Sequence, residues 1–221
     1  MKNIYSFKIT FLLIIILIIS CNGKTKWENE IGRSCRLILD TDMESDVDDV
    51  GALSMLHALA DSGEVEILGV MVCAKNPWSI LCADRINTYY KREDILLGQL
   101  RRQGINRESR YAKQVAKEFP GTIESFEDAM DAVEQYRRIL VSQPDSSVTI
   151  LTIGYLTNLR DLLSSDPDEY SKLSGRDLVS QKVSNWICMG GMFPSGREAN
   201  IRWDIEASVE VINKLMMHLP R

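Results

Sequence analysis

The apolar run Leu37-Ile38-Leu39 is followed at once by Asp40-Thr41-Asp42-Met43-Glu44-Ser45-Asp46-Val47-Asp48-Asp49, which places six carboxylates within ten positions. A short apolar run, an acidic stretch and then Val50-Gly51-Ala52-Leu53 are typical of a buried strand, a loop and a helix start. Ionised carboxylates crowded on one loop repel one another unless protons or a cation neutralise them. Ca²⁺ takes roughly six to eight oxygen ligands in irregular geometry, so the stretch predicts a calcium site.

Two other interpretations of the acidic stretch stay open. Asp46, Asp48 and Asp49 would also cap and charge-complement the start of a helix, although this accounts for one or two acids and not for six. A phosphatase of the haloacid dehalogenase type also has Asp-x-Asp after a strand, and Asp40 would then be its nucleophile. That class expects Thr or Val where Glu44 stands, so it is kept as an outside alternative.

The N-terminal residues 1–20 have the pattern of a secretion signal, with lysines followed by the uninterrupted apolar run Phe11 to Ile19. That run is far shorter than the roughly 20 residues that span a bilayer as a helix. Ser20 before Cys21 resembles a bacterial lipoprotein cleavage box, so Cys21 is expected to carry a lipid and anchor the exported protein to a membrane. Ordinary signal cleavage and an uncleaved anchor are the alternatives. The sequence thus predicts a signal peptide over 1–20, a tether over 21–35 and one domain over 36–221.

The formal net charge of −5 argues against a nucleic-acid partner, because such proteins neutralise phosphates with an excess of Lys and Arg. The cysteines after position 21 are scattered without paired metal-ligand spacing. Cys73 and Cys188 lie in apolar, strand-like runs and are predicted to be buried thiols, while a disulfide stays open for an exported protein.

Strand and helix patterns alternate along the domain. Further strands are predicted at 67–73, 95–98, 148–153 and 184–189, and helices at 50–59, 80–90, 126–140 and 159–163. The segment 100–110 is basic and is expected to be an exposed loop. Such alternation predicts an α/β fold, a mostly parallel sheet with helices on both faces. Ligands bind beyond the carboxyl ends of such strands, so the loops 40–49, 74–79, 153–158 and 190–204 are expected to meet.

Four motifs in these loops, in this order, resemble those of the inosine-uridine-preferring nucleoside hydrolase family. The family has an Asp-x-Asp after its first strand, an Asp pair opening a helix, a Gly-x-Leu-Thr-Asn turn, and a Met-Gly-Gly followed by Glu-x-Asn and an Asp. The matching residues of this chain are Asp40 and Asp42, Asp48-Asp49, Gly154 to Leu159, Met189-Gly190-Gly191, Glu198-Ala199-Asn200 and Asp204. The resemblance runs from about Arg36 to the end of the chain.

The resemblance implies a calcium-dependent hydrolysis of the N-glycosidic bond of ribonucleosides, which gives ribose and free base. Asp42, Asp49 and the backbone carbonyl of Ile153 would bind Ca²⁺, and Asp42 would also accept a proton from the attacking water. Carboxylates suit this chemistry because the sugar passes through an oxocarbenium-like state that they stabilise.

The resemblance also implies four residues that hold the ribose hydroxyls: Asp48, Asn76, Glu198 and Asn200. An Asx turn before Pro77 is an equally simple role for the asparagine at position 76. A solvated acid beside Arg197 is the alternative for the glutamate. Trp78, Phe193 and Trp203 would stack on a base or pack in the core.

Members of the family continue past the point that matches Arg221, and that later segment supplies another Asp ligand and a His that protonates the leaving base. Neither His57 nor His218 matches this His, so the domain is expected to be incomplete at its C-terminus. A nucleoside-binding lipoprotein without catalysis is therefore the alternative function. The expected partners are a small-molecule nucleoside and the membrane, with homo-oligomerisation left open.

Overall fold

The structure is a computed structural model that describes residues 34–216, so the predicted signal peptide, Cys21 and nearly all of the predicted tether lie outside the described residues. The chain divides into the units Met1–Ser34 and Cys35–Arg221, and the sheet and the described helices belong to the second unit. Among the described helices, none combines the length and the apolar character needed to cross a membrane.

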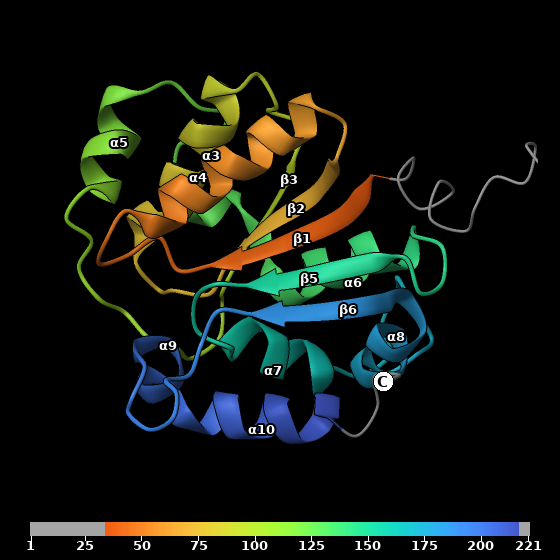
Figure 1. Ribbon diagram of the computed structural model, residues 1–221. Coiled ribbons are helices and arrows are strands. Elements are labelled where there is room, and N and C mark those ends of the chain that lie inside the picture. The colour runs from red at the N-terminus through yellow and green to blue at the C-terminus, as the bar shows by residue number, and fades with distance from the viewer. Residues whose placement is uncertain (1–33, 217–221) are drawn as a thin grey trace, which may run out of the picture. The chain divides into compact units, whose positions relative to one another are not determined.

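Six strands form one sheet in the order β4-β3-β2-β1-β5-β6, and every neighbouring pair is parallel (Figure 1). In chain order these are β1 (Cys35–Thr41), β2 (Val65–Val72), β3 (Leu96–Gln99), β4 (Met130–Asp131), β5 (Val148–Thr152) and β6 (Val183–Cys188). The strand β1 lies between β2 and β5, so the acidic stretch that follows it starts from the middle of the sheet. The predicted parallel sheet is confirmed.

Helices cover both faces of the sheet. Alternate side chains of β1 point to opposite faces and pack in two different cores. Leu37 and Leu39 pack in one core with residues of three helices, and Ile38 packs in the other core with residues of four. The first core involves α3 (Asp48–Asp61), α4 (Pro77–Tyr89) and α5 (Ala112–Glu118), and the second involves α6 (Ala132–Val141), α7 (Thr157–Leu163), α8 (Gly175–Lys182) and α10 (Ile205–Met216). The predicted α/β class is therefore confirmed.

The carboxyl ends of the central strands lie on one side of the molecule, where the short helix α9 (Ala199–Trp203) is also found (Figure 1). Backbone hydrogen bonds continue the sheet past the strand ends and tie the loops to one another. Cys73 N donates to Thr41 O at 2.9 Å, Ile153 N to Asp40 O at 2.8 Å and Met189 N to Thr152 O at 2.8 Å. The loops after β1, β2, β5 and β6 therefore start from a common edge, as the sequence predicted.

Two local expectations were wrong. The predicted helix over 126–140 is a 3₁₀ turn (Phe126–Asp128), the short strand β4 and then α6, which starts only at Ala132. Asp131 sets this start, because its side chain accepts hydrogen bonds from the first free amides of α6, and the two residues of β4 are paired with β3. The basic segment 100–110 is not simply an exposed loop, since Leu100 is buried and Arg107 lines a cavity.

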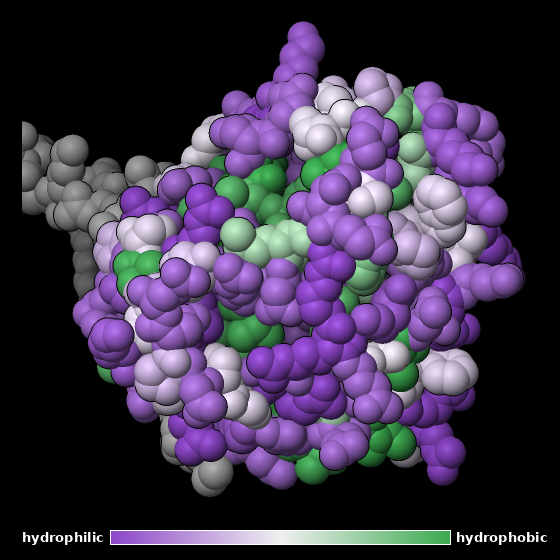
Figure 2. Space-filling view, turned by 180° about the vertical axis from the view of Figure 1, so that it is seen from behind, coloured by the Kyte–Doolittle hydropathy of each residue, from purple (hydrophilic) through white to green (hydrophobic). Residues whose placement is uncertain are grey.

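The surface is mostly hydrophilic, and the described cysteines form no disulfide. Figure 2 shows hydrophilic side chains over most of one face, with hydrophobic residues visible between them. All four described cysteines are free thiols. Cys73 is buried, as predicted, and its thiol donates to Thr41 O at 3.3 Å, whereas Cys188 is only partly buried because β6 lies at the edge of the sheet.

Candidate active site

A polar cavity of about 150 Å³ lies at the carboxyl edge of the sheet, where the loops after β1, β5 and β6 meet. The segment 100–111 and the start of α9 complete its wall. The lining residues are Asp42, Ser45, Asp46, Asp48, Asp49, Arg107, Ile153, Tyr155, Met189, Glu198, Ala199 and Asn200. The cavity thus contains the predicted metal ligands, the predicted water-activating residue and three of the four predicted ribose-binding residues.

Asp42 and Asp49 are the two most buried carboxylates of the cavity, with 8% and 4% of their surface exposed. Asp42 Oδ1 accepts a 3.0 Å hydrogen bond from the amide of Glu44, and the hydroxyl of Thr41 donates to Asp49 Oδ1. Burial raises the pKa of Asp42 to about 6. Burial, and next the negative charge of Asp42, raise the pKa of Asp49 to about 8. A bound cation would stabilise the ionised forms of these two buried, neighbouring carboxylates.

Asp48 and Asp49 are neighbours in the first turn of α3, but their side chains have different surroundings. Successive residues of a helix point in directions about 100° apart. Asp49 is therefore buried against β1, whereas Asp48 is exposed and faces the cavity. Its charge lies near enough to contribute to the raised pKa of Asp42.

The turn after β5 brings Ile153 to the wall of the cavity, next to Asn200. The side-chain amide of Asn200 donates to Ile153 O at 2.8 Å and to Met189 O at 3.3 Å. A carbonyl oxygen has two lone pairs, so Ile153 O can still bind a cation while it accepts this hydrogen bond. Asn200 thereby joins the loops after β5 and β6.

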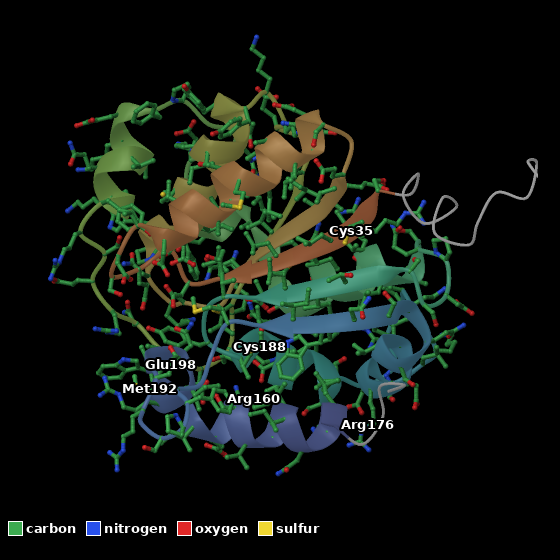
Figure 3. The ribbon with its side chains drawn as sticks, viewed as in Figure 1. Cys35, Arg160, Arg176, Cys188, Met192 and Glu198 are labelled. Carbon is green, nitrogen blue, oxygen red and sulfur yellow. The ribbon has the colours of Figure 1, made fainter. Side chains whose placement is uncertain are left out.

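Glu198 is the N-cap of α9, and Figure 3 shows it on the side of the molecule where β6 ends. Its Oε1 accepts from the amide of Asn200 at 2.7 Å, and its Oε2 accepts from Ile201 N at 3.1 Å and from Gly191 N at 3.3 Å. The side chain is thus fixed by three amides while it lines the cavity, and it is not a freely solvated acid.

The structure does not place Asn76 among the residues that line the cavity. Asn76 caps α4 by accepting from Trp78 N at 3.0 Å, and its Nδ2 donates to the carbonyl of Arg107 at 2.9 Å. The first of these contacts is the Asx arrangement expected as the alternative. Asn76 therefore lies behind Arg107.

Glu44, Arg107 and Tyr155 form a hydrogen-bonded group beside the cavity, and the sequence did not predict that these three residues meet. Glu44 is buried, and it accepts from the Tyr155 hydroxyl at 2.8 Å and from the Arg107 amide at 2.9 Å. Burial raises the pKa of Glu44 to about 7. Only the acidic stretch itself pointed to Glu44, and no local pattern pointed to Arg107.

Asp40 does not line the cavity. Its carboxylate is buried below the turn after β5 and accepts from Tyr136 OH at 2.9 Å and from Asn158 Nδ2 at 3.1 Å. Burial raises its pKa to about 7. The phosphatase alternative needs this residue as a nucleophile facing a substrate, and the geometry gives that alternative no support.

The aromatic candidates have separate locations. Trp203 is 41% exposed and lies beside the cavity, with the guanidinium of Arg107 4.4 Å from its ring centroid. Trp78 packs against the core of α3 and α4, and Phe193 is 92% exposed. Trp203 is thus in contact with a residue of the cavity wall.

The donor set of the cavity fits a hard divalent cation. Among residues 34–216 there is no group of three or more His, Cys, Asp or Glu side chains in metal-binding arrangement. Two buried carboxylates and one carbonyl are nevertheless oxygen ligands of the kind that Ca²⁺ and Mg²⁺ prefer. Further positions would be left for water and for hydroxyl groups of a ligand.

The fold is shared with solved structures of low sequence identity. The type III effector protein XopQ complexed with adenosine diphosphate ribose has a TM-score of 0.65 and 17% identity, over 84% of this chain and 54% of that chain. The plant nucleoside hydrolase PpNRh1 has a TM-score of 0.59 and 22% identity, over 81% of this chain and 57% of that chain. The purine-preferring ribonucleoside hydrolase from Gardnerella vaginalis has a TM-score of 0.59 and 18% identity, over 81% of this chain and 58% of that chain. The chain thus spans little more than half the length of these proteins.

No curated protein sequence matches the chain. The family model described as inosine-uridine preferring nucleoside hydrolase, however, matches residues 37–220, which include nearly the whole sheet and every residue of the cavity. The chain therefore belongs to the inosine-uridine preferring nucleoside hydrolase family.

Proposed function

We propose that the chain hydrolyses the N-glycosidic bond of ribonucleosides in a calcium-dependent reaction, releasing ribose and a free base. One observation carries the proposal: Asp42, Asp49 and Ile153, whose carbonyl accepts from Asn200, line the same cavity as Asp48, Glu198 and Asn200. The first three are oxygen ligands for a cation, and the others are polar groups of the kind that hold sugar hydroxyls. The family match supports the same chemistry.

Ca²⁺ is favoured over Mg²⁺ because the candidate ligands include a backbone carbonyl, which Ca²⁺ accepts more readily. Asp42, Asp49 and Ile153 would hold the ion. When bound, the cation supplies positive charge that offsets the repulsion of the carboxylates and makes a nearby water easier to deprotonate.

The residues of the chain would act on the substrate as follows. Asp42 accepts a proton from the attacking water, a role that suits a carboxylate in the wall of the cavity. Glu198 and Asn200 position the ribose, and Asp48 receives a ribose hydroxyl at the exposed side of the cavity. The negative charge of the cavity stabilises the oxocarbenium-like sugar that forms as the glycosidic bond breaks.

Protonation of the leaving base is the step for which the described residues offer no histidine. His57, the histidine of that part of the chain, contacts Asn87 at 3.0 Å, stacks on Tyr90 and does not line the cavity. Loss of a general acid typically slows a reaction by about 10²- to 10⁴-fold. This observation keeps a nucleoside-binding protein without catalysis as the second candidate function.

Two substrates separate these candidates. The purified chain with Ca²⁺ should hydrolyse p-nitrophenyl riboside, whose leaving group departs without an acid, faster than inosine. Asp42→Ala should abolish the hydrolysis of both, since the base that activates water is lost. Calorimetry would show ribose binding in either case. Ribose binding without hydrolysis of either substrate would establish the binding protein, and absence of both would refute the proposed function.

We also propose that the protein is exported and held at a membrane by a lipid on Cys21, which lies outside the described residues. The support is the sequence of residues 1–21 alone. Acyl chains hold a protein at a membrane through their buried methylenes. Cys21→Ala should therefore prevent lipid labelling and move the protein from the membrane to the soluble fraction. Unchanged labelling would refute the lipid anchor.

A further inference from the structure

A second cavity, of about 360 Å³, lies among α3, α4 and α5, the helices that pack on one face of the sheet (Figure 1). Among the described residues, it shares no lining residue with the polar cavity at the carboxyl edge. Its volume is within the roughly 300–1,000 Å³ of pockets that enclose a small-molecule ligand. This three-helix cavity is lined by Val50, Ser54, Arg85, Ile86, Tyr89, Tyr90, Val115 and Phe119.

The wall of the three-helix cavity is mainly apolar and aromatic. Tyr89 is 70% exposed and Phe119 is 46% exposed, so the described residues leave much of each ring open. The ring of Tyr90 is already stacked on His57, with centroids 4.4 Å apart, and meets Tyr89 edge-on at 5.2 Å. Aromatic rings pair favourably in stacked or edge-to-face arrangements at such distances. The open ring surfaces of Tyr89 and Phe119 therefore favour a ligand that has an aromatic ring.

Arg85 is the one charged side chain among the described residues that line this cavity, and it is only 7% exposed. Its Nε donates to Ala116 O at 3.3 Å, and its Nη1 donates to Ile123 O at 2.6 Å and to Asp84 Oδ2. Within residues 34–216, no acceptor is hydrogen-bonded to Nη2. An arginine has five N–H donors, and two of them belong to Nη2. These two donors are therefore left for a ligand that enters the cavity.

The position of the Arg85 guanidinium is fixed before any ligand binds. Its partner Asp84 is held by the amide of Thr122 at 2.9 Å, by the hydroxyl of Thr122 at 2.6 Å and by the amide of Ile123 at 3.4 Å. A guanidinium that is anchored through Nε and Nη1 presents Nη2 in one direction, so a ligand does not have to immobilise a long side chain. The donor is thus preorganised.

The other polar features of the cavity also suit an anion. Ser54 of α3 lines the cavity, and its hydroxyl can donate one hydrogen bond. The described lining contains no Asp or Glu, in contrast to the acidic wall of the polar cavity, so a carboxylate meets no like charge there. A carboxylate accepts hydrogen bonds from a guanidinium about twice as strongly as a neutral carbonyl does.

We propose that the three-helix cavity binds a small aromatic carboxylic acid. The ring of the ligand lies against Tyr89 and Phe119, and its carboxylate accepts hydrogen bonds from Arg85 Nη2 and from the hydroxyl of Ser54. This site does not depend on the proposed hydrolysis, because the two cavities have separate walls.

The first test measures binding of 2-naphthoate to the full chain by calorimetry. 2-Naphthamide keeps the rings without the charge, so it should bind about 5- to 15-fold more weakly, as expected when a charged hydrogen bond becomes a neutral one. Octanoate keeps the carboxylate without the rings and should also bind more weakly. Inosine should not displace 2-naphthoate, because the nucleoside belongs to the other cavity.

Variants of two helices locate the ligand. Val115→Trp fills the cavity from α5 and should weaken the binding of 2-naphthoate at least about fivefold. Gln114→Trp is the matched control, because Gln114 is the preceding residue of α5, is exposed and does not line the cavity. Ser54→Ala removes one donor and should weaken binding about 2- to 10-fold. If Val115→Trp does not fold, Ser54→Ala decides. Arg85 is left unaltered, since its loss would leave Asp84 buried without a cation.

Absence of binding heat up to about 1 mM 2-naphthoate would overturn the proposal and leave water as the occupant. Equal affinity for the acid and the amide would refute the role of Arg85, and tighter binding of octanoate would refute the aromatic class. Equal weakening by Val115→Trp and Gln114→Trp, or displacement by inosine, would place the ligand outside the three-helix cavity. A dimer in sedimentation that Val115→Trp dissociates would show that a second copy occupies the cavity, and this result would overturn the proposal too.

Discussion

A β-carbon on Gly154 would lie 2.7 Å from the backbone nitrogen of Asp42, closer than real Cβ atoms approach a backbone. The turn after β5 thus packs directly on the backbone of the acidic loop after β1. The amide of Ile153, which donates to Asp40 O at 2.8 Å, holds the same two segments together. Glycine at position 154 is what allows the proposed carbonyl ligand and the proposed carboxylate ligand to share one cavity.

Gly154→Ala should therefore damage both stability and metal binding. The added methyl would also meet Cys73 Sγ at 2.7 Å, so one of the two loops must move. We expect a loss of about 1–3 kcal/mol in the free energy of unfolding, as for other overpacked interiors, and a weaker calcium response. Gly51→Ala in α3 is the control, because nothing lies within 4 Å of its Cβ position and alanine favours a helix. Equal stability of the two variants in urea unfolding would contradict the role of Gly154.

Asp49→Asn should stabilise the metal-free protein and abolish most of its response to calcium. Burial and the charge of Asp42 raise the pKa of Asp49 to about 8, so its ionised form is unfavourable in the fold. In chelator at pH 8.5 we expect the variant to melt about 2–4 °C above the unaltered chain. With Ca²⁺ at 100 times its Kd, the unaltered chain should gain about 2.7 kcal/mol and the variant much less.

Asp46→Asn is the matched control for Asp49→Asn, because Asp46 belongs to the same acidic stretch and lines the cavity but is exposed. It should keep a calcium shift in Tm close to that of the unaltered chain. If Asp46→Asn and Asp49→Asn lose the shift equally, the acids attract cations only through their summed charge, and the specific site is refuted.

The stability of the metal-free chain should rise as the pH falls from about 8 to about 5.5. Five buried acids have pKa values raised mainly by burial: Asp40 to about 7, Asp42 to about 6, Glu44 to about 7, Asp49 to about 8, and Asp161 in the same direction. Between about pH 4 and these values the folded state holds protons that the unfolded state has released. Raising the pH through that range therefore destabilises the fold. His57 opposes the trend below about pH 6.5, because burial lowers its pKa and the unfolded state binds that proton first.

Calcium should act in the opposite direction, since it binds ionised carboxylates and displaces their protons. The Tm increase on adding Ca²⁺ should consequently be larger at pH 8.5 than at pH 5.5. Scanning calorimetry at both pH values, with chelator and with Ca²⁺, measures the difference. An equal increase at the two pH values would show that the cation does not compete with the protons of this cluster.

The sequence predicted which loops meet at the cavity because the signals for those loops are local. Asp42 and Asp49 follow one apolar strand, and Asn200 and Glu198 follow another, so the rule for parallel sheets was enough to bring them together. Arg107 could not be found in this way. Its backbone is held by Glu44 and Asn76, which lie 63 and 31 positions away in the chain. Such contacts leave no periodic pattern in a sequence.

The same limit explains the misassigned helix over 126–140. The apolar residues have helical spacing, but Met130 and Asp131 pair with Gly98 and Gln99 of β3, and that pairing overrides the local preference. Sheet pairing between distant residues is decided by tertiary structure, and a two-residue strand is too short to show an alternating pattern.

The buried guanidinium of Arg137 provides a prediction independent of the proposed reaction. Its side chain is 1% exposed and forms two hydrogen bonds to Asp168, of 2.5 and 3.0 Å. It also donates to the carbonyls of Ser171 and Leu173. These contacts hold the segment between α7 and α8 against α6.

Asp168→Ala should lower the free energy of unfolding by about 2 kcal/mol, because it leaves a buried positive charge with neutral partners only. The expected loss is at the low end for buried pairs since the side chain of Asp168 is itself 31% exposed. Asp145→Ala is the control, because Asp145 pairs with Lys182 at 2.7 Å on the surface, where screening makes ion pairs weak. Urea unfolding of both variants measures the difference. A loss in Asp168→Ala no larger than that in Asp145→Ala would show that the remaining carbonyl contacts are sufficient to hold Arg137.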